Sequence, residues 1–184
     1  MALRTGRYVL GPQDGTVLVM TGREGPAARM GHELTLEAMR WNATVVVDVE
    51  DPSRSKVTAS VDAGSLVVLE ARGGPLGLSD SQRVEVENIV RERVLRSDRH
   101  PRITFRSTAV SGDAGRASVT GKLSIRGRTR PVTLELRASR AKLPRIVATA
   151  AIVQTDFGIR PYSALHGALR VTDSVDLRVE VLLG

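Results

Sequence analysis

Residues 100–131 constrain the fold of this chain more than any other segment. They read HPRITFRSTAVSGDAGRASVTGKLSIRGRTRP, in which apolar and polar residues alternate on both sides of a turn at 111–115. Alternation with period two around a turn rich in glycine and aspartate predicts a β-hairpin with one apolar face. The positions expected on that face are Ile103, Phe105, Ser107 and Ala109 before the turn, and Val119, Gly121, Leu123 and Ile125 after it.

The same alternation recurs along most of the chain, and short turns containing Gly, Pro or Asp separate the segments. Because repeated strand–helix–strand units are absent, an antiparallel sheet is expected. A sandwich and a barrel both fit the pattern, but closure of a barrel removes exposed edges. We therefore predict an all-β fold, an antiparallel β-barrel with one long helix, formed as a single domain by residues 1–184. The side chains expected inside are Trp41, Val45, Val47, Phe105, Leu123, Leu134, Leu136, Leu177 and Val179; those expected outside are Thr44, Arg106, Lys122 and Arg137.

One segment, residues 81–96, has helical rather than strand periodicity. Val86, Ile89, Val90 and Val94 recur at spacings of three and four, and Ser79 with Gln82 has the spacing of a capping box. The apolar stripe is narrow. This helix is therefore expected to flank or plug the sheet, and it is too slender to fill a barrel whose inward residues are mostly small or branched aliphatics.

Composition excludes several classes of function. The chain has no cysteine, which rules out disulfides, thiolate nucleophiles and cysteine metal sites. The net charge is +7, but the arginines are dispersed and aromatic residues make up only 3%, whereas nucleic-acid binding favours basic residues interleaved with stacking aromatics. No apolar run is long enough to span a membrane as a helix, and the N-terminus lacks the apolar core of a secretion signal. A soluble, cytoplasmic protein that does not bind nucleic acid is expected.

Four motifs resemble the YceI-like family. HPRITFRST at 100–108 is similar to its P-x-I-x-F-x-S strand, and 119–132 resembles its V-x-G-x-L-x-I-x-G-x-x-x-P-V hairpin. QTDFGI at 154–159 is similar to the family's S-D-F-G-I segment, and VTDSVDL at 171–177 to its V-x-D-x-V-x-L ending. The four motifs occur in the family's order, although its D-x-x-H-S opening is missing.

The resemblance implies a lipocalin-like barrel, crossed by a helix, whose interior holds a long isoprenoid or another amphiphilic lipid. It brings no catalytic residue, no metal and no cofactor. Most apolar ligand sites are lined by apolar and aromatic side chains, although core packing is an equally good explanation for an inward aromatic. The residues expected to contact the ligand are Trp41, Phe105, Gly121, Leu123, Ala150, Phe157, Tyr162 and His166.

An alternative function is an enzyme that isomerises or hydrolyses a hydrophobic small molecule inside the barrel. Its acid–base groups could come from His32, Asp156 and His166, provided that the fold brings them together. The inward positions named above include no ionisable group, which favours binding without chemistry. The sequence is compatible with a monomer or a homodimer.

Overall fold

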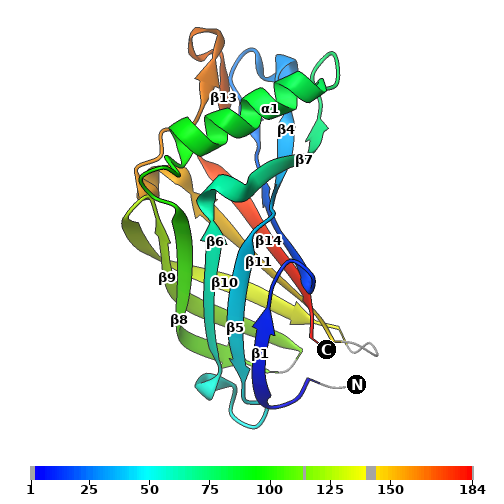
Figure 1. Ribbon diagram of the computed structural model, residues 1–184, viewed down its shortest axis with the longest axis vertical. Coiled ribbons are helices and arrows are strands. Elements are labelled where there is room, and N and C mark those ends of the chain that lie inside the picture. Colours follow the sequence, from blue (N-terminus) through cyan, green and yellow to red (C-terminus); the bar gives the residue numbers. More distant parts are fainter. Residues whose placement is uncertain (1–2, 114, 140–143, 184) are drawn as a thin grey trace.

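A computed structural model of the chain describes residues 3–113, 115–139 and 144–183. Eleven strands form one curled antiparallel sheet, a half-barrel with the order β1-β5-β6-β8-β9-β10-β11-β14-β2-β4-β7, as predicted for an all-β, lipocalin-like fold (Figure 1). A small sheet, β12-β13-β3, lies at one end. The strands are β1 (Gly6–Leu10), β2 (Gly15–Met20), β3 (Arg23–Glu24), β4 (Glu33–Ala38), β5 (Trp41–Val47), β6 (Lys56–Asp62), β7 (Leu66–Arg72), β8 (Arg102–Gly112), β9 (Arg116–Ile125), β10 (Arg128–Ala138), β11 (Arg145–Val153), β12 (Ser163–Ala164), β13 (Leu169–Val171) and β14 (Ser174–Leu182).

Three strand pairs that are consecutive in sequence curl the sheet around its interior. β1 and β2, β4 and β5, and β6 and β7 each follow one another across a short break of two to four residues. Within each pair one strand belongs to the β1 end of the sheet order and the other to the β7 end. The chain therefore connects the two ends of the sheet three times, and its apolar faces enclose a common interior.

The alternation correctly predicts which side chains face this interior. Trp41, Val47, Phe105 and Leu123 are buried, whereas Arg106, Lys122 and Arg137 are exposed; Thr44 is half-buried. Val45, Leu134, Leu136, Leu177 and Val179 are only half-buried although they pack against the core cluster. Partial exposure on an inward face indicates that the interior is not completely filled.

The prediction that Ala109 faces inward is wrong. The register of β8 against β9 shifts between Ser107 and Ala109, so Thr108 is a β-bulge. A bulge adds one residue to a strand and reverses the alternation beyond it. Ala109 is consequently exposed, and Val110 packs against the core instead.

The helix is present where the periodicity predicts it. Helix α1 (Asp80–Ile89) starts with the expected capping box between Ser79 and Gln82, and a π-helical turn continues it over Val90–Val94. The helix lies across one end of the sheet, next to the edge strand β7 (Figure 1). Its polar side chains supply partners for this edge, since Glu87 accepts a hydrogen bond from the Val68 N–H (2.9 Å) and Arg83 donates to the Val68 carbonyl (3.3 Å). The helix thus covers part of the β7 edge of the curled sheet.

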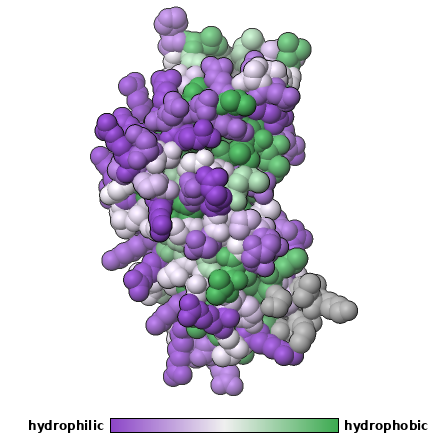
Figure 2. Space-filling view, viewed as in Figure 1, coloured by the Kyte–Doolittle hydropathy of each residue, from purple (hydrophilic) through white to green (hydrophobic). Residues whose placement is uncertain are grey.

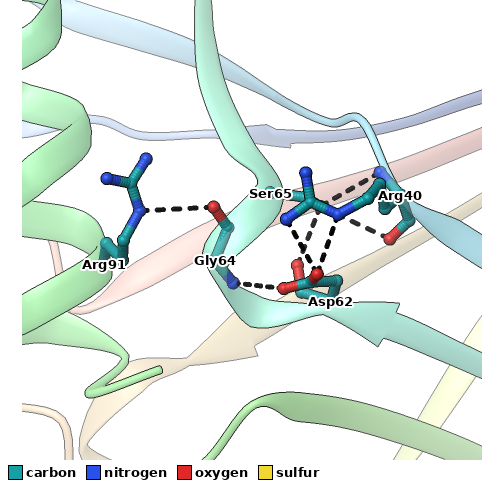
Figure 3. A network of polar contacts seen from close by, with 5 residues as sticks. All are labelled: Arg40, Asp62, Gly64, Ser65 and Arg91. Atoms are coloured by element: carbon teal, nitrogen blue, oxygen red, sulfur yellow. Dashed lines mark hydrogen bonds and ion pairs between the residues drawn. The ribbon is translucent and has the colours of Figure 1, made fainter. Parts of the chain in front are cut away.

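A polar network fixes the break between β6 and β7 (Figure 3). Asp62 accepts hydrogen bonds from the Arg40 guanidinium and the Gly64 N–H, each 2.8 Å long. Arg91 of the π-helical turn donates to the Gly64 carbonyl (3.3 Å). Burial opposes ionisation of Asp62, but these hydrogen bonds and the charge of Arg40 outweigh it and hold the pKa of Asp62 below its usual value of 3.8. The Asp62 carboxylate therefore ties the β6–β7 break to Arg40, and the Arg91–Gly64 hydrogen bond ties it to the π-helical turn.

This network predicts a pH dependence of stability. A lowered folded-state pKa means that ionised Asp62 contributes stability above the usual Asp pKa, and that this contribution is lost as the pH falls through the lowered value. We expect Asp62→Asn to lower the urea midpoint at pH 7 and to flatten its decline below about pH 4 relative to the wild type. Asp98→Asn is the matched control, because the Asp98 side chain is 76% exposed. Parallel pH profiles for Asp62→Asn and the wild type would contradict the assignment.

Candidate functional site: an apolar cavity with a polar mouth

A cavity of about 620 Å³ runs through the curled sheet. Every long strand contributes to its wall, and helix α1 with the π-helical turn closes one side through Val86, Ile89, Val90 and Val94. This is the apolar stripe of the helix, so the stripe faces the interior as expected from its periodicity. The volume lies within the range of roughly 300–1,000 Å³ that is typical of small-molecule and cofactor sites.

Polar side chains gather at the end of the cavity near the small sheet and α1. Arg23, His32, Tyr162 and Arg170 line this end. The exposed residues Met30 and Arg170 also belong to the lining at this end, and we infer that the cavity opens here. We call this end the mouth. The site thus combines a long apolar body with a polar opening.

The ionisable residues of the mouth are engaged with protein partners. Arg23 forms an ion pair with Glu33 (3.7 Å), and Arg170 forms one with Glu24 (3.4 Å). The His32 ring nitrogen Nε2 lies 2.8 Å from the Leu76 carbonyl oxygen. The last two contacts join the segment around residues 24–32 to the segments that carry Arg170 and Leu76.

Four of the sequence-predicted ligand residues line the cavity: Trp41, Phe105, Leu123 and Tyr162. The first three come from β5, β8 and β9 and form part of the apolar body. Tyr162 is at the mouth, where the Arg93 guanidinium carbon lies 5.7 Å from the centre of its ring. This cation–π contact joins the π-helical turn to the segment that precedes β12.

The other four predicted residues lie outside the cavity lining. A Cβ atom on Gly121 would come within 2.4 Å of the Phe105 ring and 2.6 Å of the Arg106 carbonyl, so this glycine permits close packing of β9 on β8. Ala150 packs against the core cluster, Phe157 is 2% exposed within it, and His166 is exposed. An inward or loop aromatic can serve packing rather than a ligand, and period-two patterns do not separate the two roles.

Apart from Tyr162, the sequence-predicted ligand residues do not include the residues that form the mouth. Met30, Leu78 and Leu169 line the cavity from a 3-10 turn (Ala28–Met30), an irregular segment and the short strand β13. The sequence contains no periodic signal there, because these segments are too short to show one. Glycines at 31, 73 and 74 are the sequence signal that marks this region. Each lies so close to a neighbouring side chain that a Cβ atom added there would displace that side chain.

The structure does not favour the acid–base alternative. Of His32, Asp156 and His166, only His32 lines the cavity, while Asp156 and His166 are exposed. Within residues 3–113, 115–139 and 144–183, no group of three His, Asp or Glu side chains is arranged to hold a metal ion. The same part of the chain has no helix long and apolar enough to cross a membrane.

The basic hairpin turn after β9 has a structural role. Arg126 and Gly127 both have positive φ angles (51° and 73°), and Arg126 donates to the Gly158 carbonyl (3.1 Å). Burial, together with the nearby charges of Arg96 and Arg128, lowers the pKa of Arg126. The turn thereby anchors the segment that carries Phe157.

A curled antiparallel sheet that encloses an apolar cavity defines a half-barrel of the lipocalin-like class. The model of the YceI-like domain family matches residues 15–183, and the chain belongs to this family. Protein YceI of Shigella flexneri is 28% identical over 98 residues, which are 53% of this chain and 44% of that protein. Protein YceI of Escherichia coli O157:H7 has the same identity and coverage. The alignments thus cover less than half the length of these curated relatives.

Solved structures agree on the fold. Burkholderia cenocepacia BcnA superimposes with a TM-score of 0.69 at 16% identity, covering 92% of this chain and 96% of BcnA. A polyisoprenoid binding domain from Saccharophagus degradans has a TM-score of 0.60 at 9% identity, with 97% and 98% covered. The Campylobacter jejuni YCEI protein has a TM-score of 0.60 at 15% identity, with 80% and 82% covered.

Proposed function

We propose that this chain binds a long-chain apolar amphiphile, an isoprenoid or a similar lipid, and performs no chemistry on it. The observation that carries the proposal is the cavity of about 620 Å³, whose body is apolar and whose mouth is polar. Water in an apolar cavity of this shape finds few hydrogen-bond partners. An elongated apolar guest would instead make van der Waals contacts with the lining. The structural similarity to a polyisoprenoid binding domain supports the isoprenoid class.

The distribution of polar groups supports binding over catalysis. The ionisable side chains of the lining are at the mouth, where Arg23, Arg170 and His32 already have protein partners. A lipid would place its polar head beside them and its tail among Trp41, Phe105 and Leu123. General acid–base catalysis needs a titratable group within hydrogen-bond reach of the reacting atom. The apolar body of the cavity has no such group next to the lipid tail.

The single tryptophan makes the proposal directly testable. Trp41 is the only tryptophan of the sequence and lines the cavity, so its emission reports on cavity contents. We expect native mass spectrometry of freshly purified protein to show a copurifying lipid. We also expect titration of delipidated protein with a long-chain polyprenol to change the Trp41 emission saturably.

A saturated fatty alcohol with the same number of carbon atoms as the polyprenol is the comparison ligand. A weaker Trp41 response to this alcohol than to the polyprenol would support the isoprenoid class. The absence of both a copurifying lipid and a Trp41 response would overturn the proposal.

A further inference from the structure

Three apolar side chains are exposed around the mouth. Met30 is 57% exposed, Leu76 80% and Leu165 56%. Each belongs to a different loop, and all three loops lie at the end of the molecule that carries β13 and the start of α1 (Figure 1). Figure 2 shows hydrophobic side chains at the surface of this end, interspersed with hydrophilic ones. Single exposed apolar residues are common, but a group of three around the opening of a cavity is not explained by chance exposure alone.

Direct contacts hold the three loops together. The Ala27 N–H donates to the Ala168 carbonyl (2.9 Å), which joins the Met30 loop to the Leu165 loop. His32 is bonded to the Leu76 carbonyl (2.8 Å), which joins the Met30 loop to the third. The three exposed side chains are therefore presented by one connected structure, which we call the tip and define as residues 23–33, 72–79 and 160–170.

The backbone of the Leu165 loop is strained in a way that keeps its apolar side chain at the surface. Leu165 and His166 have φ angles of 52° and 54°, followed by Gly167 at 87°. A positive φ is unfavourable for a bulky residue such as leucine. Strain of this kind is concentrated at functional sites, and here it accompanies exposure of Leu165 rather than its burial.

The exposed surface is continuous with the cavity. Met30 belongs both to the exposed group and to the cavity lining, and Leu78 and Leu169 continue the apolar lining inward from the other two loops. A lipid tail could leave a bilayer and enter the cavity along these side chains without crossing bulk water.

The charge of the tip indicates which surface it fits. Its three segments contain five arginines (Arg23, Arg29, Arg72, Arg160 and Arg170) and two glutamates (Glu24 and Glu33). Three of these arginines form ion pairs: Arg23 with Glu33, Arg170 with Glu24, and Arg72 with Glu70 just outside the tip. The excess positive charge of the tip therefore comes from Arg29 and Arg160. A basic surface with protruding apolar side chains matches a bilayer that contains anionic lipids, because apolar insertion and attraction to headgroups then act together.

We propose that the tip docks reversibly on an anionic lipid bilayer and that the cavity exchanges its ligand there. The inference rests on the proposed lipid-binding function, because docking would bring the mouth against the source of the ligand. The apolar side chains insert at the headgroup level and the arginines contact anionic headgroups.

The test is flotation of the full chain with vesicles of phosphatidylcholine, with and without phosphatidylglycerol. We expect the wild type to bind the anionic vesicles preferentially, and high salt to weaken binding. The triple variant Met30→Ser, Leu76→Ser, Leu165→Ser should partition roughly tenfold or more weakly. A matched triple variant at exposed apolar positions of the strands, Val9→Ser, Val46→Ser, Leu182→Ser, should bind like the wild type.

Each result is decisive. The inference is overturned if the wild type binds neither vesicle, if it binds both equally, or if the tip variant binds as well as the wild type. It is also overturned if the wild type is a dimer that the tip variant disrupts, because the tip would then be covered by a second copy. Titration with a dispersed polyprenol, followed by Trp41 emission, separates this failure from failure of the cavity proposal. A double variant restricted to Leu76→Ser and Leu165→Ser, two tip positions outside the cavity lining, should respond normally there.

Discussion

A double variant that fills one end of the cavity, Val45→Phe with Val57→Phe, is expected to weaken binding of a long-chain polyprenol by roughly tenfold or more, or about 1.4 kcal/mol. Val45 and Val57 are paired across β5 and β6, and both line the cavity. These strands run away from the end covered by α1 (Figure 1). Two added rings would occupy the space for the far end of a long tail. A short isoprenoid alcohol, which does not need this space, should lose much less affinity.

The control places the same rings on the outside of the same strands. Val46→Phe with Thr58→Phe changes exposed positions adjacent in sequence to the first pair. We expect its polyprenol affinity, measured by Trp41 emission, to equal that of the wild type. Equal affinity of both double variants would show that the ligand does not occupy the cavity, whereas loss of cooperative unfolding in the first variant alone would show that this region is already packed.

The second large effect concerns stability. Phe157→Ala should lower the free energy of unfolding by about 3–5 kcal/mol, because it leaves a cavity in the core. Phe157 is 2% exposed and belongs to the core cluster, although it comes from a 3-10 turn (Gln154–Phe157) and the sequence suggests it as a ligand contact. The measurement is urea unfolding monitored by circular dichroism.

Asp156→Ala is the control for this variant, since Asp156 is the exposed neighbour in the same turn. Under conditions in which the Phe157→Ala variant remains folded, the polyprenol affinity of this variant should equal that of the wild type, because Phe157 does not line the cavity. Unchanged stability combined with weakened polyprenol binding would instead assign Phe157 to the ligand site.

The sequence by itself determined those features of this protein that depend only on residues close together along the chain. Period-two alternation identified the inward faces of β5, β8, β9, β10 and β14, because each strand side chain points opposite to the next. The capping box at Ser79 and the apolar spacing up to Val94 located the helix for the same local reason. Four ligand candidates, Trp41, Phe105, Leu123 and Tyr162, do line the cavity.

The tertiary structure decided everything that depends on which segments meet. Alternation carries no information on the partner of a strand. The breaks at 11–14, 39–40 and 63–65, each of which carries the chain from one end of the sheet order to the other, could therefore not be derived locally. The bulge at Thr108 also depends on pairing, since it exists only relative to β9. An inward side chain is apolar whether it packs in a core or lines a cavity. Only tertiary packing determined that Tyr162 is at the mouth while Phe157 is buried in the core.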